Sequence, residues 1–326
     1  MSTIILRLMT PVLAGALCAS MAPWSVVHAA KDFNISSPAS PQGSVEIVDI
    51  AGSVEVEGWD RPEVEVSGTP DDLAGRVRMS SSGDQTTIHV MPFSIGGDSG
   101  GDIRLVVHVP AKSSVSTSLV SASLKVHGLQ GEAYLRSISG SISGEVSGNL
   151  RVNTVSGTVR LSAPAAQRIE IKTVSGSVQL TGGSGEAELG TVSGKMQADL
   201  GSLTRGRFKS ISGDVTANFS VAHDAEIEAE SVSGTLRFGF ASIPGADFDV
   251  QSFSGSIDNC FGPKPAESQY GPGSTLTFKS GDGHANVRIA SKSGDIHLCT
   301  GSAHASPAAF AVPQKVRCWQ DMLYVI

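Results

Sequence analysis

A short motif that recurs down most of the chain constrains the fold more than any other feature. A representative copy is Thr-Val-Ser-Gly-Thr-Val at residues 154–159, and each copy contains one glycine that marks its register. The clear copies place this glycine at Gly140, Gly157, Gly176, Gly194, Gly213, Gly234 and Gly255, and a looser copy places it at Gly294. From Gly140 to Gly255 the successive spacings are 17, 19, 18, 19, 21 and 21 residues. A period of this length is typical of repeat proteins, whose units pack mainly against their neighbours.

Within one unit, apolar and polar residues alternate, which is the pattern of a half-buried strand. In the copy at residues 154–161 the expected apolar face contains Val155, Gly157, Val159 and Leu161, and the expected polar face contains Ser156, Thr158 and Arg160. A glycine on the apolar face suits a corner or a close approach between backbones. We therefore predict that the register glycines lie at the corners of the repeats.

One unit alone buries too little to fold. Three or four branched side chains at about 2 kcal/mol each do not offset the ordering of about 19 residues. Copies stacked about 4.8 Å apart would pair strand on strand and align their apolar residues in a continuous core. The composition, with 37 glycines and 5% aromatic residues, also favours strands and turns. The prediction is an all-β β-solenoid, similar to a single-stranded β-helix, with repeats of about 17–21 residues and a cap at each end.

The segments outside the repeats predict the remaining organisation. Residues 1–29 have the charged, apolar and small-residue parts of a signal peptide, with cleavage after Ala29; a single-span anchor is the alternative. We expect a flexible leader at 30–43 and opening strands that form an N-terminal cap at 44–110. The repeats with a C-terminal disulfide cap would occupy 111–300, and a disordered tail 301–326. No segment of the mature chain is long and apolar enough to predict a membrane span.

Charge and cysteine content narrow the partners and the compartment. The formal net charge is −7 and the sequence has no block of Lys or Arg, which argues against a nucleic-acid partner. After signal cleavage the chain would retain Cys260, Cys299 and Cys318. In an exported chain we expect Cys260 and Cys299 to form a disulfide, because they bracket an irregular insertion near the end of the repeats. Cys318 is left over.

The order of these features resembles the bacterial DUF4097 family of adhesins. The resemblance covers roughly residues 44–299 and rests on the Gly-Ser-Val-Glu-Val-Glu-Gly-Trp-Asp opening at 52–60, the Val-Ser-Gly repeats and the closing Ser-Gly-Asp-Ile segment. It implies a right-handed β-solenoid in an envelope or surface protein. It implies no catalytic residues.

The candidate chemical groups favour structural roles. Ser99 lies in a Gly-Asp-Ser-Gly-Gly string, but a nucleophile elbow needs a strand that runs into a helix, and here we expect a loop between strands. Asp98 and Asp102 in the same loop lack the ligand spacing of a calcium loop.

Other polar and aromatic groups also have ordinary structural interpretations. We expect a solvated strand face for Glu226, Glu228 and Glu230, and surface positions for His89, His108, His284 and His297. Neither a metal site nor a cofactor is predicted, because the cysteines and histidines lack ligand spacing. The aromatic residues expected to close the ends of the core are Trp59, Phe93, Phe261 and Tyr270.

These observations predict a noncatalytic exported protein of the cell envelope or surface. It would lie in the periplasm or outside the cell and bind a protein or glycan through an extended face. Two alternatives remain open at this point. One is a polysaccharide-active enzyme on a β-helix, and the other is a periplasmic envelope-stress signalling module.

Overall fold

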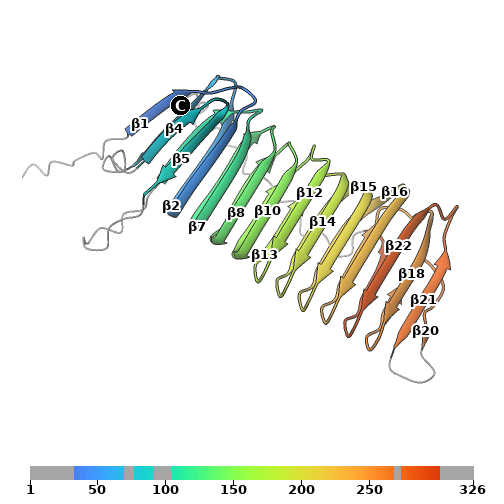
Figure 1. Cartoon of the computed structure of the whole chain (residues 1–326). Coiled ribbons are helices and arrows are strands. Elements are labelled where there is room, and N and C mark those ends of the chain that lie inside the picture. The colour runs from blue at the N-terminus through green and yellow to red at the C-terminus, as the bar shows by residue number, and fades with distance from the viewer. Residues whose placement is uncertain (1–32, 70–76, 92–103, 268–272, 302–326) are drawn as a thin grey trace, which may run out of the picture. The chain divides into compact units, whose positions relative to one another are not determined.

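The computed structural model describes residues 33–69, 77–91, 104–267 and 273–301, and their strands join one 23-stranded sheet (Figure 1). The first thirteen strands are β1 (Phe33–Pro38), β2 (Ser44–Trp59), β3 (Glu63–Thr69), β4 (Val77–Ser82), β5 (Gln85–Val90), β6 (Arg104–Pro110), β7 (Ser114–Leu129), β8 (Ala133–Ser139), β9 (Ile142–Val146), β10 (Leu150–Ser156), β11 (Thr158–Ser162), β12 (Arg168–Thr173) and β13 (Ser177–Thr181). The others are β14 (Gly185–Thr191), β15 (Met196–Ser210), β16 (Val215–Ser231), β17 (Leu236–Phe240), β18 (Ala246–Ser252), β19 (Ile257–Asn259), β20 (Ala266–Glu267), β21 (Ser274–Lys279), β22 (Ala285–Ser291) and β23 (Ile296–Thr300). The described residues contain no helix, so the prediction of an all-β chain is confirmed. The predictions for the signal peptide, cleavage after Ala29, Ser99, Phe93, Tyr270, Cys318 and the tail lie outside the described residues.

Each repeat forms one rung, which we define as the strand before the register glycine together with the strand after it. In the middle of the chain a strand pairs in parallel with the strand two positions later, as β10 does with β12 and β11 with β13. Figure 1 shows the first strands of successive rungs side by side, from β7 through β8, β10, β12 and β14 to β15. The repeat period in the sequence is therefore the length of chain that completes one rung.

The parallel register aligns apolar residues in continuous columns. One column contains Leu135, Val152, Ile171, Leu189 and Phe208, each opposite its neighbour in the ladder and each buried. Since paired strands lie about 4.8 Å apart, each side chain contacts the one above and the one below. This column is part of the hydrophobic core.

The register glycines form a second column, at the corner of each rung. A Cβ atom added at Gly176 would collide with the carbonyl oxygen of Gly157, and one added at Gly194 would collide with that of Gly176. Gly157 also has a φ of +148°, which glycine adopts more readily than other residues. The same column continues through Gly140, Gly213, Gly234, Gly255 and Gly294, each against the backbone of a neighbouring rung. Glycine is favoured because backbones meet here with little space for a side chain, and the rung next to Gly140 has the next smallest residue, Ala122, at this position.

The first residue of the motif satisfies the backbone at this corner. The buried hydroxyl of Thr191 accepts a hydrogen bond from the Gly194 amide at 2.8 Å, and Ser210 accepts one from the Gly213 amide at 3.0 Å. Equivalent bonds of 2.8–3.1 Å occur at Gly176, Gly234, Gly255 and Gly294. A hydroxyl at this position therefore pairs an amide that the bend removes from the strand ladder.

The order of the rungs differs from the order of the chain at the C-terminal end. The last repeat in the chain does not form the outermost rung: β22 lies between β16 and β18, and β23 lies between β17 and β19. Figure 1 shows this insertion, with β22 between β16 and β18. The outer layer at this end consists of β18, which pairs antiparallel with β21, and β21 in turn pairs with β20. All rungs carry the same motif, so the motif does not encode which rung stacks on which.

The N-terminal end shows a similar rearrangement. Strand β2 pairs in parallel with β7 on one side and with β5 and β6 on the other, so the first repeat lies inside the array. The expected flexible leader is wrong for residues 33–38, which form β1 and pair antiparallel with β3. Phe33 in β1 is only 5% exposed, and burial of this ring explains why the segment is ordered.

The C-terminal half is filled by phenylalanines and closed by a disulfide. The rings of Phe208, Phe219, Phe238, Phe240 and Phe248 are fully buried, with neighbouring centroids 5.2–6.0 Å apart. The predicted disulfide between Cys260 and Cys299 is confirmed. It joins the end of β19 to β23 and so attaches the outer layer to the inserted rung.

Candidate functional site

A stripe of exposed apolar side chains runs across seven consecutive rungs. It consists of the second motif residue in these seven rungs, and we call it the Val/Ile stripe: Val120, Ile138, Val155, Val174, Val192, Ile211 and Val232. These side chains are 39–52% exposed, although the residue before each of them in the motif is buried. In the last two copies of the motif the same position holds Phe253 and Lys292, which are also exposed. Six rung intervals of about 4.8 Å give the stripe a length of about 29 Å.

The exposure of Val155 corrects the expectation that it faces the core together with Val159. The strand alternation does not continue through the corner, because the chain bends at Gly157 between β10 and β11. Thr154 is therefore buried, Val155 is 47% exposed, and the inward phase resumes at Val159. The uninterrupted period-2 pattern in the sequence concealed the stripe.

The third residue of the motif has a structural role that is distinct from the stripe. Motif serines donate a hydrogen bond to the carbonyl of the stripe residue in the adjacent rung, as Ser175 does to Val155 and Ser193 to Val174. The same bond, at 3.0–3.4 Å, is made by Ser139, Ser156, Ser212, Ser233 and Ser293. The first, third and fourth motif residues thus stabilise the corner, whereas the second presents an exposed apolar side chain.

The stripe forms one wall of a groove with a volume of about 1000 Å³. The opposite wall is the outward row of residues two positions earlier, which includes Arg136, Asn153, Lys172, Lys209 and Glu230. The floor is the row of buried Thr and Ser residues between the two walls. The groove is therefore apolar on one side and lined by long polar side chains on the other.

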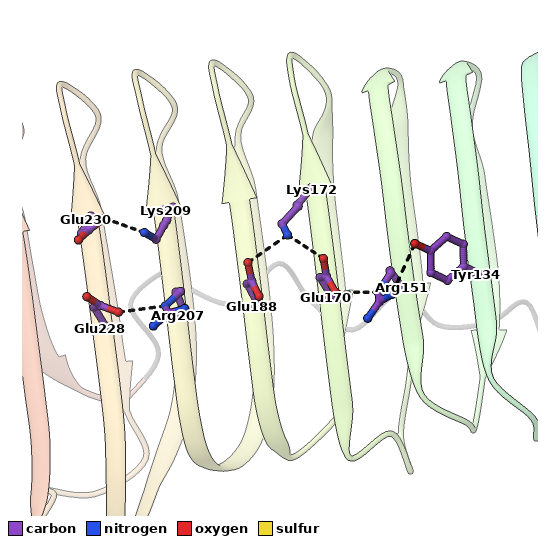
Figure 2. A network of polar contacts seen from close by, with 9 residues as sticks. All are labelled: Tyr134, Arg151, Glu170, Lys172, Glu188, Arg207, Lys209, Glu228 and Glu230. Carbon is purple, nitrogen blue, oxygen red and sulfur yellow. Dashed lines mark hydrogen bonds and ion pairs between the residues drawn. The ribbon is translucent and has the colours of Figure 1, made fainter.

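The polar side chains beside the groove are paired with one another across rungs. Figure 2 shows Arg151 between Tyr134 and Glu170, and Lys172 between Glu170 and Glu188. The Arg151–Glu170 and Lys172–Glu170 ion pairs both measure 2.7 Å. The hydrogen bond from Lys172 lowers the pKa of Glu170, and Arg151 adds to this effect. Hydrogen bonds from Arg151 and Arg136 lower the pKa of Tyr134.

The three predicted surface glutamates belong to the same arrangement. Glu226, Glu228 and Glu230 point outward and form ion pairs with Arg205, Arg207 and Lys209 of the neighbouring strand, at 3.7, 2.9 and 3.0 Å. Figure 2 shows the pairs of Glu228 and Glu230. Carboxylates that face cations in a ladder stabilise the pairing of strands.

The histidines that sequence analysis placed on the surface are dispersed. His89 is exposed on β5, and His108 is half-buried on β6, where it stacks on Trp59 and lies 3.1 Å from Glu57. His297 lies 3.5 Å from Asp258 near the disulfide. His284 is the exception: it lies beside His223, a residue that sequence analysis did not single out.

The fold and the groove define a class: an all-β repeat protein that carries an exposed apolar stripe along its rungs. The model of the Toastrack DUF4097 family matches residues 75–299, which confirms the resemblance. The chain belongs to the DUF4097 family.

The chain also resembles solved structures at low sequence identity. A candidate lipid-binding protein from Parabacteroides distasonis is 13% identical, with a TM-score of 0.46 and coverage of 82% of this chain and 96% of that chain. A candidate adhesin from Bacteroides fragilis is 8% identical, with a TM-score of 0.39 and coverage of 82% and 97%. A candidate adhesin from P. distasonis is 12% identical, with a TM-score of 0.28 and coverage of 82% and 98%. No curated protein is significantly similar to the chain.

Proposed function

We propose that this protein is a noncatalytic β-solenoid scaffold of the bacterial cell envelope or surface, which binds a protein partner along the Val/Ile stripe. The observation that carries this proposal is the repeated choice of Val or Ile at a motif position that is exposed to solvent in seven rungs. A threonine there would suit a strand equally well. Seven exposed apolar side chains in one row, rimmed by polar residues, are typical of an interaction surface.

The surroundings of the stripe favour a protein over a glycan or an anionic membrane. Glycan sites commonly stack sugars on aromatic rings, whereas the stripe is aliphatic over all seven rungs. An anionic lipid surface attracts clusters of unpaired Lys and Arg, but Lys172 and Lys209 beside the groove are both paired with glutamates. A protein with an apolar ridge and a mixed polar rim fits this groove.

Two further observations support export and the absence of catalysis. The signal-peptide pattern at residues 1–29 and the Cys260–Cys299 disulfide are typical of an exported chain. The described residues contain no helix that could span a membrane. The carboxylates of Glu170, Glu188, Glu228 and Glu230 face cations in a ladder (Figure 2), whereas an enzyme acting on polysaccharide would need carboxylates free to act as acid and base.

The experiment that tests the proposal compares two triple variants that change the same three rungs. The stripe variant is Val155→Ser, Val174→Ser and Val192→Ser, and the control variant is Arg160→Ser, Gln179→Ser and Gln197→Ser on the neighbouring face. We measure how much purified protein cosediments with isolated envelopes of the source bacterium. The stripe variant is expected to lose at least ten-fold in retention, while the control variant retains wild-type binding and both keep the wild-type circular dichroism spectrum.

Two further measurements separate the partner classes and test export. If retention survives protease treatment of the envelopes, or occurs on vesicles of phosphatidylethanolamine and phosphatidylglycerol, the partner is lipid and not protein. Equal retention of the two variants would refute the role of the stripe. Protease shaving of intact cells, beside periplasmic fractionation, shows whether the chain is exported and to which side of the envelope.

A further inference from the structure

A group of histidine and aspartate side chains lies where the inserted rung meets β16. His223 and Asp224 lie in β16, and Asp282 and His284 lie just before β22. The two histidine ring centroids are 4.3 Å apart, and the donor atoms of His223, Asp282 and His284 all lie within 4.8 Å of one another. The two segments are about 60 residues apart in the chain, which explains why spacing in the sequence did not reveal the group.

The backbone on the β16 side projects these residues out of the ladder. Between β15 and β16, Leu203 pairs with Val221 and Arg205 with Glu226, so that residues 222–225 of β16 lie opposite Thr204 alone. Asp224, at this bulge, has a φ of +60° and is the single non-glycine residue with positive φ in the described part of the chain. A bulge of this kind directs side chains away from the regular strand surface.

The backbone on the other side presents Asp282 in a comparable way. Asp282 lies between Gly281 and Gly283, whose φ values are +60° and +63°. The turn is closed by a hydrogen bond from the Gly283 amide to the Ser280 carbonyl at 3.2 Å. The parallel register of Glu226 with Asn286 then places His284 level with Asp224. The side chains from both segments are 54–72% exposed, so that an ion from solvent can reach them.

We infer that His223, His284 and Asp282 bind a divalent transition-metal ion of the zinc type, which attaches the inserted rung to β16. Two imidazoles and a carboxylate suit Zn²⁺ and its neighbours Co²⁺, Ni²⁺ and Cu²⁺, whereas Ca²⁺ and Mg²⁺ require oxygen ligands. Zn–N bonds of about 2.0–2.1 Å require donor atoms about 3.3 Å apart. The donor atoms here lie within 4.8 Å of one another, and rotation of the exposed side chains can bring them to the shorter separation. Water completes the coordination shell of a site of this kind.

Asp224 acts as a positioning residue for this site. Its Oδ2 atom lies 2.9 Å from His223 Nδ1, and the other nitrogen of that ring, Nε2, lies 3.9 Å from Asp282 Oδ2. A carboxylate that holds one imidazole nitrogen while the other binds the metal is a common outer-shell arrangement in zinc proteins. Asp224 Oδ1 also lies 3.7 Å from His284 Nδ1, so this one side chain faces both rings.

The test is a calorimetric titration of the untagged full chain with Zn²⁺, and with Ca²⁺ in parallel. Wild-type protein is expected to bind one Zn²⁺ per chain and to show no heat of binding with Ca²⁺. His223→Ala and His284→Ala are expected to lose binding at least 100-fold, and Asp224→Asn about 10- to 100-fold. The control variant is His297→Ala, which removes the His297–Asp258 pair near the disulfide. It is expected to bind Zn²⁺ as the wild-type protein does. Visible absorption of the Co²⁺-loaded protein gives a second readout, which should vanish in the His223→Ala variant.

Two results would overturn the inference. One is Zn²⁺ binding that is unchanged in the His223→Ala and His284→Ala double variant. The other is the absence of stoichiometric Zn²⁺ binding in a wild-type protein whose circular dichroism shows it to be folded. Neither result bears on the Val/Ile stripe, because none of the three proposed ligands lines the groove.

Discussion

At the scale of single residues, glycines that look alike in the sequence have different roles. The register glycine Gly194 packs against the backbone of Gly176, where an added Cβ would collide with a carbonyl oxygen. Gly190, four residues earlier, faces only Lys172 Cγ at an ordinary contact distance of 3.7 Å. The difference is one of location, because one glycine lies at the corner and the other within strand β14.

This contrast gives a matched pair of substitutions. Gly194→Ala is expected to lower the free energy of unfolding by about 3 kcal/mol, since two backbones would have to separate to admit the methyl group. Gly190→Ala is expected to change it by less than about 0.5 kcal/mol, because its site admits the methyl group. Urea unfolding followed by circular dichroism measures both. Equal effects of the two substitutions would contradict the close contact at the corners.

Individual residues also show which features of the fold and the candidate sites could be predicted from the sequence and which could not. The repeat and the all-β class could be predicted, because the period and the alternation are local properties of the chain. The disulfide between Cys260 and Cys299 could be predicted from their position around the insertion. The solvent exposure of Val155 could not, since it depends on the bend after the motif, and the meeting of His223 with His284 could not, since it depends on which rungs are neighbours.

At the scale of strands, cross-rung ion pairs connect β10, β12 and β14 on their outward face. Glu170 on β12 lies between Arg151 on β10 and Lys172 on its own strand, and Lys172 reaches on to Glu188 on β14. These pairs join strands that are neighbours only after folding. They therefore favour the native register over a slipped one.

The lowered pKa of Glu170 predicts a dependence of stability on pH. A carboxyl group whose pKa is lower in the folded than in the unfolded chain stabilises the fold above its unfolded value, and this contribution is lost as the pH falls through the folded value. At pH 7, Glu170→Gln is expected to reduce the free energy of unfolding by about 1 kcal/mol. The loss should shrink toward zero well below pH 4.5, the ordinary value of this group. Urea unfolding of both proteins at pH 7 and pH 3 measures the difference, and a loss that is as large at pH 3 would contradict the ion-pair explanation.

At the scale of the whole array, the rungs are nearly interchangeable in the middle and specific at the ends. In the middle each rung stacks on the previous one in the chain, and its motif supplies the same corner, serine bond and stripe residue. At both ends a repeat is enclosed by strands that belong to other segments. The stacking could be predicted from the sequence but this enclosure could not, because the motif recurs in the rungs without a mark that distinguishes their neighbours.

The interchangeability predicts that one central rung can be removed. Deletion of residues 158–176 joins Gly157 to Ser177, places Arg151 opposite Glu188, and keeps Val155 beside Val192. We expect a protein with the wild-type circular dichroism spectrum and cooperative thermal unfolding, because nearest-neighbour contacts remain the same in kind.

A deletion that is one residue shorter provides the control. Removal of residues 158–175 leaves two glycines at the corner and shifts the following strand by one residue, which would turn its apolar side chains outward. This variant is expected to aggregate or to melt at a lower temperature. Equal behaviour of the two deletions would show that the register at the corner does not specify the stacking.

The enclosed last rung has a consequence for the order in which the chain can fold as it is made. Strands β18 and β19 leave the ribosome before β22 and β23, yet in the folded protein they pair with those later strands and not with the rung that precedes them in synthesis. The outer layer must therefore wait for about 40 further residues before its parallel partner in the array exists. Until then β16 and β17 present an open edge, on which an incomplete chain is exposed to strand pairing with other molecules.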